Sequence, residues 1–274
     1  MIDFKEITSQ STLYNFHAHT LYCDGHAPME DFVREAIGQG FTHFGFSPHS
    51  PLPFESSCNM SRASVVQYLE EMDRLRARYC SRIKLYTSME IDYVDEFGPS
   101  HDFFAQLPLD YRIGSVHFIP SFDDPSEYID IDGRPERFIE KMHDHFHDDI
   151  EAVIRSFFEQ SLKMVEKGGF DVIGHFDKIG FNAEAFKSGV TLEAWYDQLV
   201  MQLFEAIMDH HYVIEINTKA WERRCRFYPD AKYFPLLKKY DCTVLVNSDA
   251  HYPDRINSGR IEALHLLKAR CVRD

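Results

Sequence analysis

Short apolar, β-rich runs that recur at helix-sized intervals constrain the fold of this chain more than any other feature. Seven such runs fall at residues 12–17, 42–47, 83–91, 111–117, 171–176, 212–217 and 242–248. Segments with helical periodicity lie between them, including 29–40, 64–80 and 135–169, the last long enough for one helix or two. Strands that alternate with helices predict a parallel α/β architecture. An open doubly wound sheet and a closed barrel both fit this pattern.

Composition narrows the class of protein. A chain of 274 residues with no low-complexity linker or internal repeat is expected to form one domain over residues 1–274. A formal net charge of −15 argues against a nucleic-acid partner, which normally requires clustered Lys and Arg. No run approaches the 18 or so apolar residues of a membrane span, and no secretory signal begins the chain. The six cysteines are scattered without a C-x-x-C pair, which favours reduced thiols in the cytoplasm.

Ionisable residues gather where the predicted strands end. His and carboxylate side chains close or follow six of the seven runs: His17, His19, His49, Glu90, His117, His175, Asp249 and His251. In parallel α/β folds, functional sites are built from residues at the carboxyl ends of the strands. The distribution therefore predicts one site that draws on most of the chain.

The spacing of these residues indicates a metal site. His17 and His19 are two residues apart, so in a strand their side chains point to the same face, and Asp249 and His251 repeat this spacing. Imidazole combined with carboxylate suits Zn, Mn or Fe, whereas Ca²⁺ or Mg²⁺ would favour oxygen ligands. With Asp24 added, the candidates exceed what one four-coordinate ion uses. We therefore predict two or three divalent ions, with Glu90 as a shared ligand.

These residues together resemble the PHP (polymerase and histidinol phosphatase) superfamily. The segments SPHSPLPF, GSVHF, FDVIGHFD, EINT and NSDAH are similar to those of its monofunctional histidinol-phosphate phosphatases. The resemblance implies a distorted TIM-like (β/α)7 barrel with a trinuclear site. By correspondence, the first ion would be held by His17, His19, Glu90 and Asp249, the second by Glu90, His117 and His175, and the third by Asp24, His49 and His251.

The resemblance also implies the activity. We expect hydrolysis of a small phosphate monoester, L-histidinol phosphate, to histidinol and phosphate in histidine biosynthesis, with a metal-bridging hydroxide as the nucleophile. Asp249 or His251 would orient that nucleophile or protonate the leaving alkoxide. Arg155 is the expected phosphate-binding residue, because such phosphatases carry an arginine there and a guanidinium binds phosphate through two donors. Ser47-Pro48 replaces the usual Thr or Ser followed by Asp before the second-strand histidine.

Other functions remain open from the sequence. Another PHP or amidohydrolase-type hydrolase could act on a different phosphoester, although the latter commonly uses a lysine where Glu90 stands here. A PHP-type exonuclease would need a basic groove. A metal-binding protein without catalysis is a further class. The stretch HDHFHDD places His143 and His147 four apart, a chelating spacing, but we interpret this acidic segment as a solvated helix face. The oligomeric state is not predicted.

Overall fold

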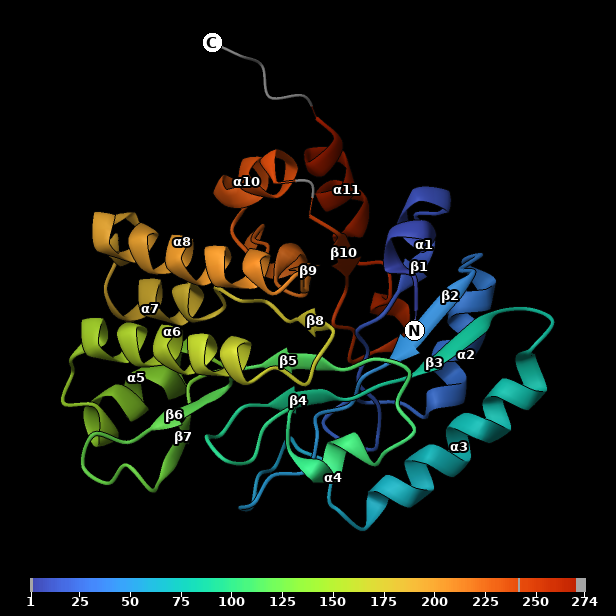
Figure 1. The fold of residues 1–274 in the computed structure, drawn as a ribbon, viewed down its shortest axis with the longest axis horizontal. Coiled ribbons are helices and arrows are strands. Elements are labelled where there is room, and N and C mark those ends of the chain that lie inside the picture. The colour runs from blue at the N-terminus through green and yellow to red at the C-terminus, as the bar shows by residue number, and fades with distance from the viewer. Residues whose placement is uncertain (1, 241, 270–274) are drawn as a thin grey trace.

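The computed structural model describes residues 2–240 and 242–269, in which strands and helices alternate along the chain (Figure 1). The strands are β1 (Tyr14–Asn15), β2 (His43–Phe46), β3 (Lys84–Thr87), β4 (Glu90–Asp92), β5 (Ile113–Ser115), β6 (Phe118–Pro120), β7 (Tyr128–Asp130), β8 (Val172–Ile173), β9 (Val213–Asn217) and β10 (Val244–Asn247). The helices are α1 (Phe4–Gln10), α2 (Met29–Gly38), α3 (Ser64–Tyr79), α4 (Asp102–Ala105), α5 (Pro135–His145), α6 (Ile150–Lys167), α7 (Ile179–Phe186), α8 (Ala194–Asp209), α9 (Trp221–Arg224), α10 (Phe234–Lys239) and α11 (Arg260–Lys268).

Two parallel sheets form the centre of the structure. One has the strand order β1-β2-β3 and the other β10-β9-β8-β5-β4, which confirms the predicted parallel α/β class. Isolated parallel bridges link the sheets, one between Ala18 and Ala250 and another between His49 and Glu90. All four bridging residues lie just beyond a strand or at its start, and each of them is, or adjoins, a predicted ligand. The sheets therefore meet at the predicted site.

The run at 83–91, predicted as one strand, is two strands in different sheets. β3 ends at Thr87 and β4 begins at Glu90, with a break at Ser88 and Met89. The buried hydroxyl of Tyr68 holds this break, because it lies 2.8 Å from the carbonyl oxygen of Ser88 and 3.0 Å from that of Phe46. The switch between sheets sends Glu90 toward the interior, where its side chain is buried.

Two other segments differ from the simple alternation of strand and helix. Residues 118–135, between two predicted elements, contain the antiparallel hairpin β6–β7, whose Ile119 and Ile129 are buried. The helical stretch 135–169 is two helices, α5 and α6. His147 and Asp148 between them have left-handed φ angles of 51° and 60°, and Asp149 caps α6 by accepting a hydrogen bond from Ala152 N. Helix propensity alone does not mark this break.

Alternation along the strands separates an apolar outer layer from a polar interior. In β9, Ile214 and Ile216 belong to the hydrophobic cluster packed against the helices, whereas Glu215 and Asn217 are buried polar residues of the opposite face. The period-2 geometry of a strand explains this division. In Figure 1, α5–α8 lie together beside β5, β6 and β8, and α2 and α3 lie beside β2 and β3. The polar interior between the strands is where the predicted ligands lie.

A buried arginine joins the two ends of the described chain. Arg260, at the start of α11, is almost fully buried and donates hydrogen bonds to the carbonyl oxygens of Val246 and Thr12. Its guanidinium lies 5.0 Å from the ring centroid of Tyr14, a cation–π distance. α11 is thereby tied to the segments around β10 and β1. Among the helices of the described residues, none combines the length and apolarity that a membrane crossing requires.

Candidate metal centre

The structure brings all of the sequence-predicted metal ligands together at the carboxyl ends of the parallel strands. Their ligand atoms form sets whose members lie within 4.8 Å of one another: His17, His19 and Asp249; Glu90, His117 and His175; His19, Asp24, His49 and His251; and His49, Asp92 and His117. The first three sets coincide with the groupings that the PHP resemblance implies, except that Glu90 is absent from the first and His19 is added to the third. The fourth set contains Asp92, which the sequence did not single out.

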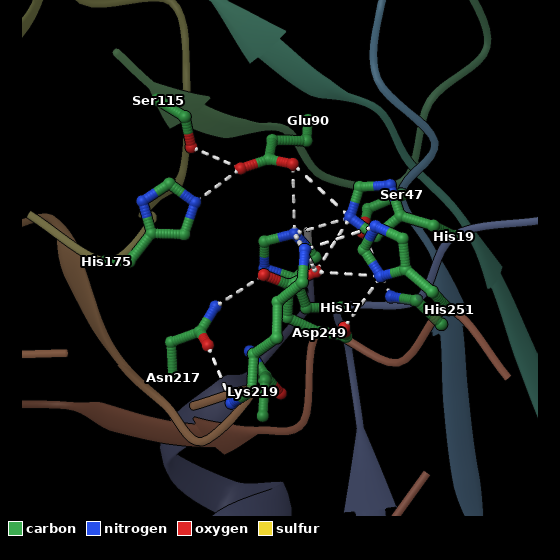
Figure 2. A network of polar contacts seen from close by, with 12 residues as sticks. His17, His19, Ser47, Glu90, Ser115, His175, Asn217, Lys219, Asp249 and His251 are labelled. Atoms are coloured by element: carbon green, nitrogen blue, oxygen red, sulfur yellow. Dashed lines mark hydrogen bonds and ion pairs between the residues drawn. The ribbon is translucent and has the colours of Figure 1, made fainter. Parts of the chain in front are cut away.

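Glu90 lies between the sets. Its Oε2 is 3.1 Å from His17 Nε2 and 3.2 Å from His49 Nδ1, while its Oε1 is 2.7 Å from His175 Nε2 (Figure 2). Ser115 Oγ donates a 2.7 Å hydrogen bond to the same Oε1. The two oxygens therefore face different groups of imidazoles. This is the arrangement that a carboxylate shared between two cations requires.

Backbone hydrogen bonds and an uncommon φ angle fix the positions of the H-x-H and D-x-H segments. His19 N donates to Ala250 O and Ala250 N donates to His17 O, so the H-x-H and D-x-H segments lie side by side. Asp249 has a φ angle of 49°, an uncommon left-handed conformation for a residue other than glycine. Such backbone strain concentrates at functional sites, where the surrounding structure holds it in place.

The unpaired atoms in the cluster fit divalent cations. The Nε2 atoms of His17 and His19 face each other at 3.1 Å, and those of His117 and His175 at 3.3 Å. Asp24 Oδ1, His49 Nδ1 and Asp249 Oδ1 are buried without a hydrogen bond, although Asp249 Oδ1 is only 3.0 Å from His19 Nε2. Buried polar atoms are normally paired. Closely spaced imidazole nitrogens with unsatisfied carboxylate oxygens suit Zn, Mn or Fe ions, so the residues present fit such a group.

Two buried carboxylates that are not among the predicted ligands fix the orientation of His17 and His117 through hydrogen bonds. Glu215 Oε1 is 2.7 Å from His17 Nδ1, and Asp92 Oδ1 is 2.6 Å from His117 Nδ1. A carboxylate can only accept, so each Nδ1 carries a proton and each Nε2 is left to face the cluster. Carboxylates commonly orient metal-binding histidines in this way.

A signal for these carboxylates exists in the sequence. Glu215 and Asn217 occupy alternate positions of an otherwise apolar strand, and Glu90 and Asp92 do the same in theirs. Burying a charge requires a partner, so a carboxylate inside each of these strands predicts a buried cation or histidine nearby.

The charges inside the cluster are coupled. Burial opposes ionisation of Glu90 and Asp249, but nearby His17, and for Asp249 also Lys219, hold both carboxyl pKa values well below their usual range. Burial also opposes protonation of His17, yet Glu215, Glu90 and Asp249 together raise its pKa well above normal. The pKa of His19 is lowered by burial and by His251 and His49. Without a metal ion, a proton on His17 thus compensates the carboxylates, and metal binding must release it.

The phosphate-binding arginine expected from the sequence lies elsewhere. Arg155 is on α6, where it forms a 2.6 Å ion pair with Glu151 and stacks over Trp195 at 5.1 Å. None of the contacts found among residues 2–240 and 242–269 joins Arg155 to a candidate ligand. His143 and His147 are also outside the cluster, exposed on the surface beside Asp148 and Asp123. Ser47 Oγ accepts a hydrogen bond from Ala18 N rather than contacting His49.

Two lysines and an open cavity adjoin the cluster. Lys219 Nζ lies 3.1 Å from His251 Nε2 and 3.5 Å from Asp249 Oδ1, and Lys178 Nζ lies 3.4 Å from His117 Nε2. A cavity of about 870 Å³ begins at Asp249 and His251. Its wall includes several charged residues and a stacked aromatic pair: Arg134, Lys219, Glu222, Arg223, Asp254, Arg255, His26 and Tyr252. The cavity therefore gives access to the cluster from the surface.

Comparisons with known proteins agree with this geometry. A model of the PHP domain matches residues 15–219. A "Probable histidinol-phosphatase" of Schizosaccharomyces pombe is 26% identical over 259 residues, which cover 88% of this chain and 81% of the relative. A structure from Listeria monocytogenes assigned as a histidinol phosphatase has a TM-score of 0.80 at 19% identity, covering 91% of this chain and 99% of that one. The Lactococcus lactis histidinol phosphate phosphatase, complexed with zinc, L-histidinol and phosphate, has a TM-score of 0.70 at 21% identity, covering 93% and 92%.

Proposed function

The chain belongs to the PHP domain family, and from this premise we propose that it is a metal-dependent L-histidinol-phosphate phosphatase. The observation that carries the proposal is the set of buried His and carboxylate ligand atoms that converge around Glu90 beside an open cavity. The relatives support the choice of substrate, because the matched protein from Schizosaccharomyces pombe and the Lactococcus lactis structure both carry the name of this activity.

We assign two or three Zn, Mn or Fe ions to the cluster. His17, His19, Glu90 and Asp249 would hold one, Glu90, His117 and His175 a second, and Asp24, His49 and His251 a third. When bound, such ions lower the pKa of a coordinated water and neutralise charge on a phosphoryl group. The zinc in the Lactococcus lactis structure supports this choice of ions.

The chain's own residues would orient the substrate. Asp249 and His251 line the cavity where it meets the cluster, so they are the groups best placed to orient the attacking water or to give a proton to the leaving alkoxide. Asp92 and Glu215 would keep His117 and His17 in a fixed tautomer. Burial of nearly every ligand excludes bulk water, which strengthens the electrostatic interactions of the site.

The cavity wall favours one alternative substrate class. Arg255 is paired with Glu222 and Asp254, whereas Arg134 and Arg223 also line the cavity. This wall suits a phosphoester that carries a further anionic group, rather than the ammonium and imidazole of histidinol. Another PHP-family hydrolase, acting on such a substrate, is therefore the second candidate.

One assay separates these candidates. Phosphate release would be measured from L-histidinol phosphate, an aryl phosphate and a sugar bisphosphate, each with zinc and with manganese. The proposal predicts the highest kcat/KM for L-histidinol phosphate. A higher kcat/KM for the sugar bisphosphate would favour the second candidate, and no release from any of the three would refute both.

The proposal also covers the closure of the fold, the number of domains and the cellular location. We propose that the two linked sheets form a distorted TIM-like (β/α)7 barrel and that residues 1–274 are one domain. The bridges between Ala18 and Ala250 and between His49 and Glu90 support the closed form. Dispersed thiols, of which those of Cys23, Cys58, Cys80 and Cys225 are free, support a cytoplasmic location.

A further inference from the structure

Lys219 occupies a place between the metal cluster and the cavity. It follows β9, and its backbone N–H donates a 3.1 Å hydrogen bond to Asn217 Oδ1, which fixes the start of the side chain. Figure 2 shows the side chain extending from there into the cluster, where Nζ approaches Asp249 and His251. The same lysine lines the cavity wall and is 38% exposed. Its ammonium group is therefore accessible from the direction in which substrate would arrive.

Three other cations, two of them near the site, are already paired with carboxylates. Lys178 forms a 2.7 Å ion pair with Asp132 and is only 10% exposed. Arg255 is held by Glu222 and Asp254, and Arg155 by Glu151. Lys219 forms its ion pair with Asp249, at 3.5 Å.

Competition between cations decides what Lys219 can bind. Asp249 and His251 are candidate metal ligands, so a divalent ion held by them would take the same atoms that Nζ now approaches. A lysine ammonium has three donors and binds phosphate as a compact charge. If metal ions held Asp249 and His251, the ammonium of Lys219 would be left to bind an anion in the cavity.

We propose that Lys219 binds the phosphate group of the substrate, the role that the sequence alone had pointed to in Arg155. This inference rests on the proposed phosphatase function and assigns one of its substrate contacts. If Lys219 had only a structural role, its replacement would also reduce metal binding. The proposal instead predicts that loss of the ammonium weakens phosphate binding and leaves metal binding unchanged.

The test compares Lys219→Met, Lys219→Arg and a control, Lys163→Met, in the metal-loaded protein. Lys163 is 43% exposed and forms a 2.9 Å pair with Glu159 on α6, so it matches Lys219 in charge and exposure. Calorimetry would measure binding of inorganic phosphate, and emission spectroscopy the metal content. Loss of a hydrogen bond between charged groups should weaken phosphate binding by roughly tenfold to a hundredfold in Lys219→Met. Lys219→Arg should retain most of the affinity, and Lys163→Met all of it.

The two readouts also separate this inference from the proposed function. Phosphate affinity within about twofold of the wild type in Lys219→Met would overturn the assignment, and so would an equal loss of bound metal, which indicates a structural role. If the wild-type protein releases no phosphate from any monoester, the phosphatase proposal fails. The calorimetric comparison would still decide whether Lys219 binds the anion.

Discussion

Replacing Glu215 by glutamine should weaken metal binding at the candidate site with little change in side-chain volume. Glu215 is fully buried and accepts four hydrogen bonds. Oε1 accepts from His17 Nδ1 at 2.7 Å and from Asn247 Nδ2 at 2.9 Å, and Oε2 accepts from His175 N and Asn217 Nδ2, both at 3.1 Å. A glutamine amide has one oxygen, so its NH₂ group must face one of these pairs of donors.

The magnitude follows from this mismatch. Two buried donors lose their acceptor at about 1–3 kcal/mol each, so the free energy of unfolding should fall by about 2–6 kcal/mol. If the amide nitrogen faces His17, the imidazole can restore the hydrogen bond only by moving its proton to Nε2, the atom that faces the metal cluster. Loss of such an orienting partner typically reduces metal affinity by about 10–100-fold.

The assay pairs a zinc competition titration with urea unfolding of the metal-free protein. Glu184→Gln is the matched control, because Glu184 also accepts several hydrogen bonds, from Gly189 N, Thr191 N and Thr191 Oγ1, but lies on α7 away from the ligands. The control should lose stability and keep its zinc affinity. If Glu215→Gln binds zinc within about twofold of the wild type, the tautomer argument is wrong.

Three further predictions concern other residues. Glu90→Gln should lower the metal content by at least one ion per chain, measured by emission spectroscopy, because both Glu90 oxygens face ligand groups; unchanged content would exclude a shared ligand. Burial, against the opposing charge of Arg226, raises the pKa of Asp177 from 3.8 to about 7. The folded chain therefore binds this proton more tightly than the unfolded chain, and its free energy of unfolding falls by a few kcal/mol as the pH rises from about 4 to 7. In Asp177→Asn, the free energy of unfolding measured in urea should depend less on pH across this range. A pH dependence equal to that of the wild type would contradict this. Arg260→Met should cost about 2–5 kcal/mol in urea unfolding, because the carbonyl oxygens of Val246 and Thr12 lose a buried donor; a cost below about 1 kcal/mol would refute it.

The periodic features of the sequence predicted most of the architecture. Strand runs and helix patterns led to the parallel α/β class, and strand ends carrying His17, His19 and Asp249 led to a common site. Both predictions depend on local periodicity and on the rule that parallel strands deliver residues to one edge. Neither requires knowledge of which strands are neighbours.

Features set by tertiary contacts could not be predicted in this way. The break between β3 and β4 depends on the hydroxyl of Tyr68, which comes from a distant helix. The family resemblance pointed to Arg155, but it carries no information on packing, and Arg155 lies with Glu151 on the exposed face of α6. Lys219 lies in a short loop without periodicity, so only the fold shows that its ammonium reaches Asp249.

The central claim is that the clustered ligands hold the ions that hydrolyse a phosphate monoester. Its most direct test is to add zinc or manganese stepwise to metal-free protein while counting bound ions and measuring phosphate released from L-histidinol phosphate. We predict that release begins only when two ions are bound per chain and is lost when a chelator removes them. Release that persists without bound metal, or a fully loaded protein that releases no phosphate, would contradict the claim.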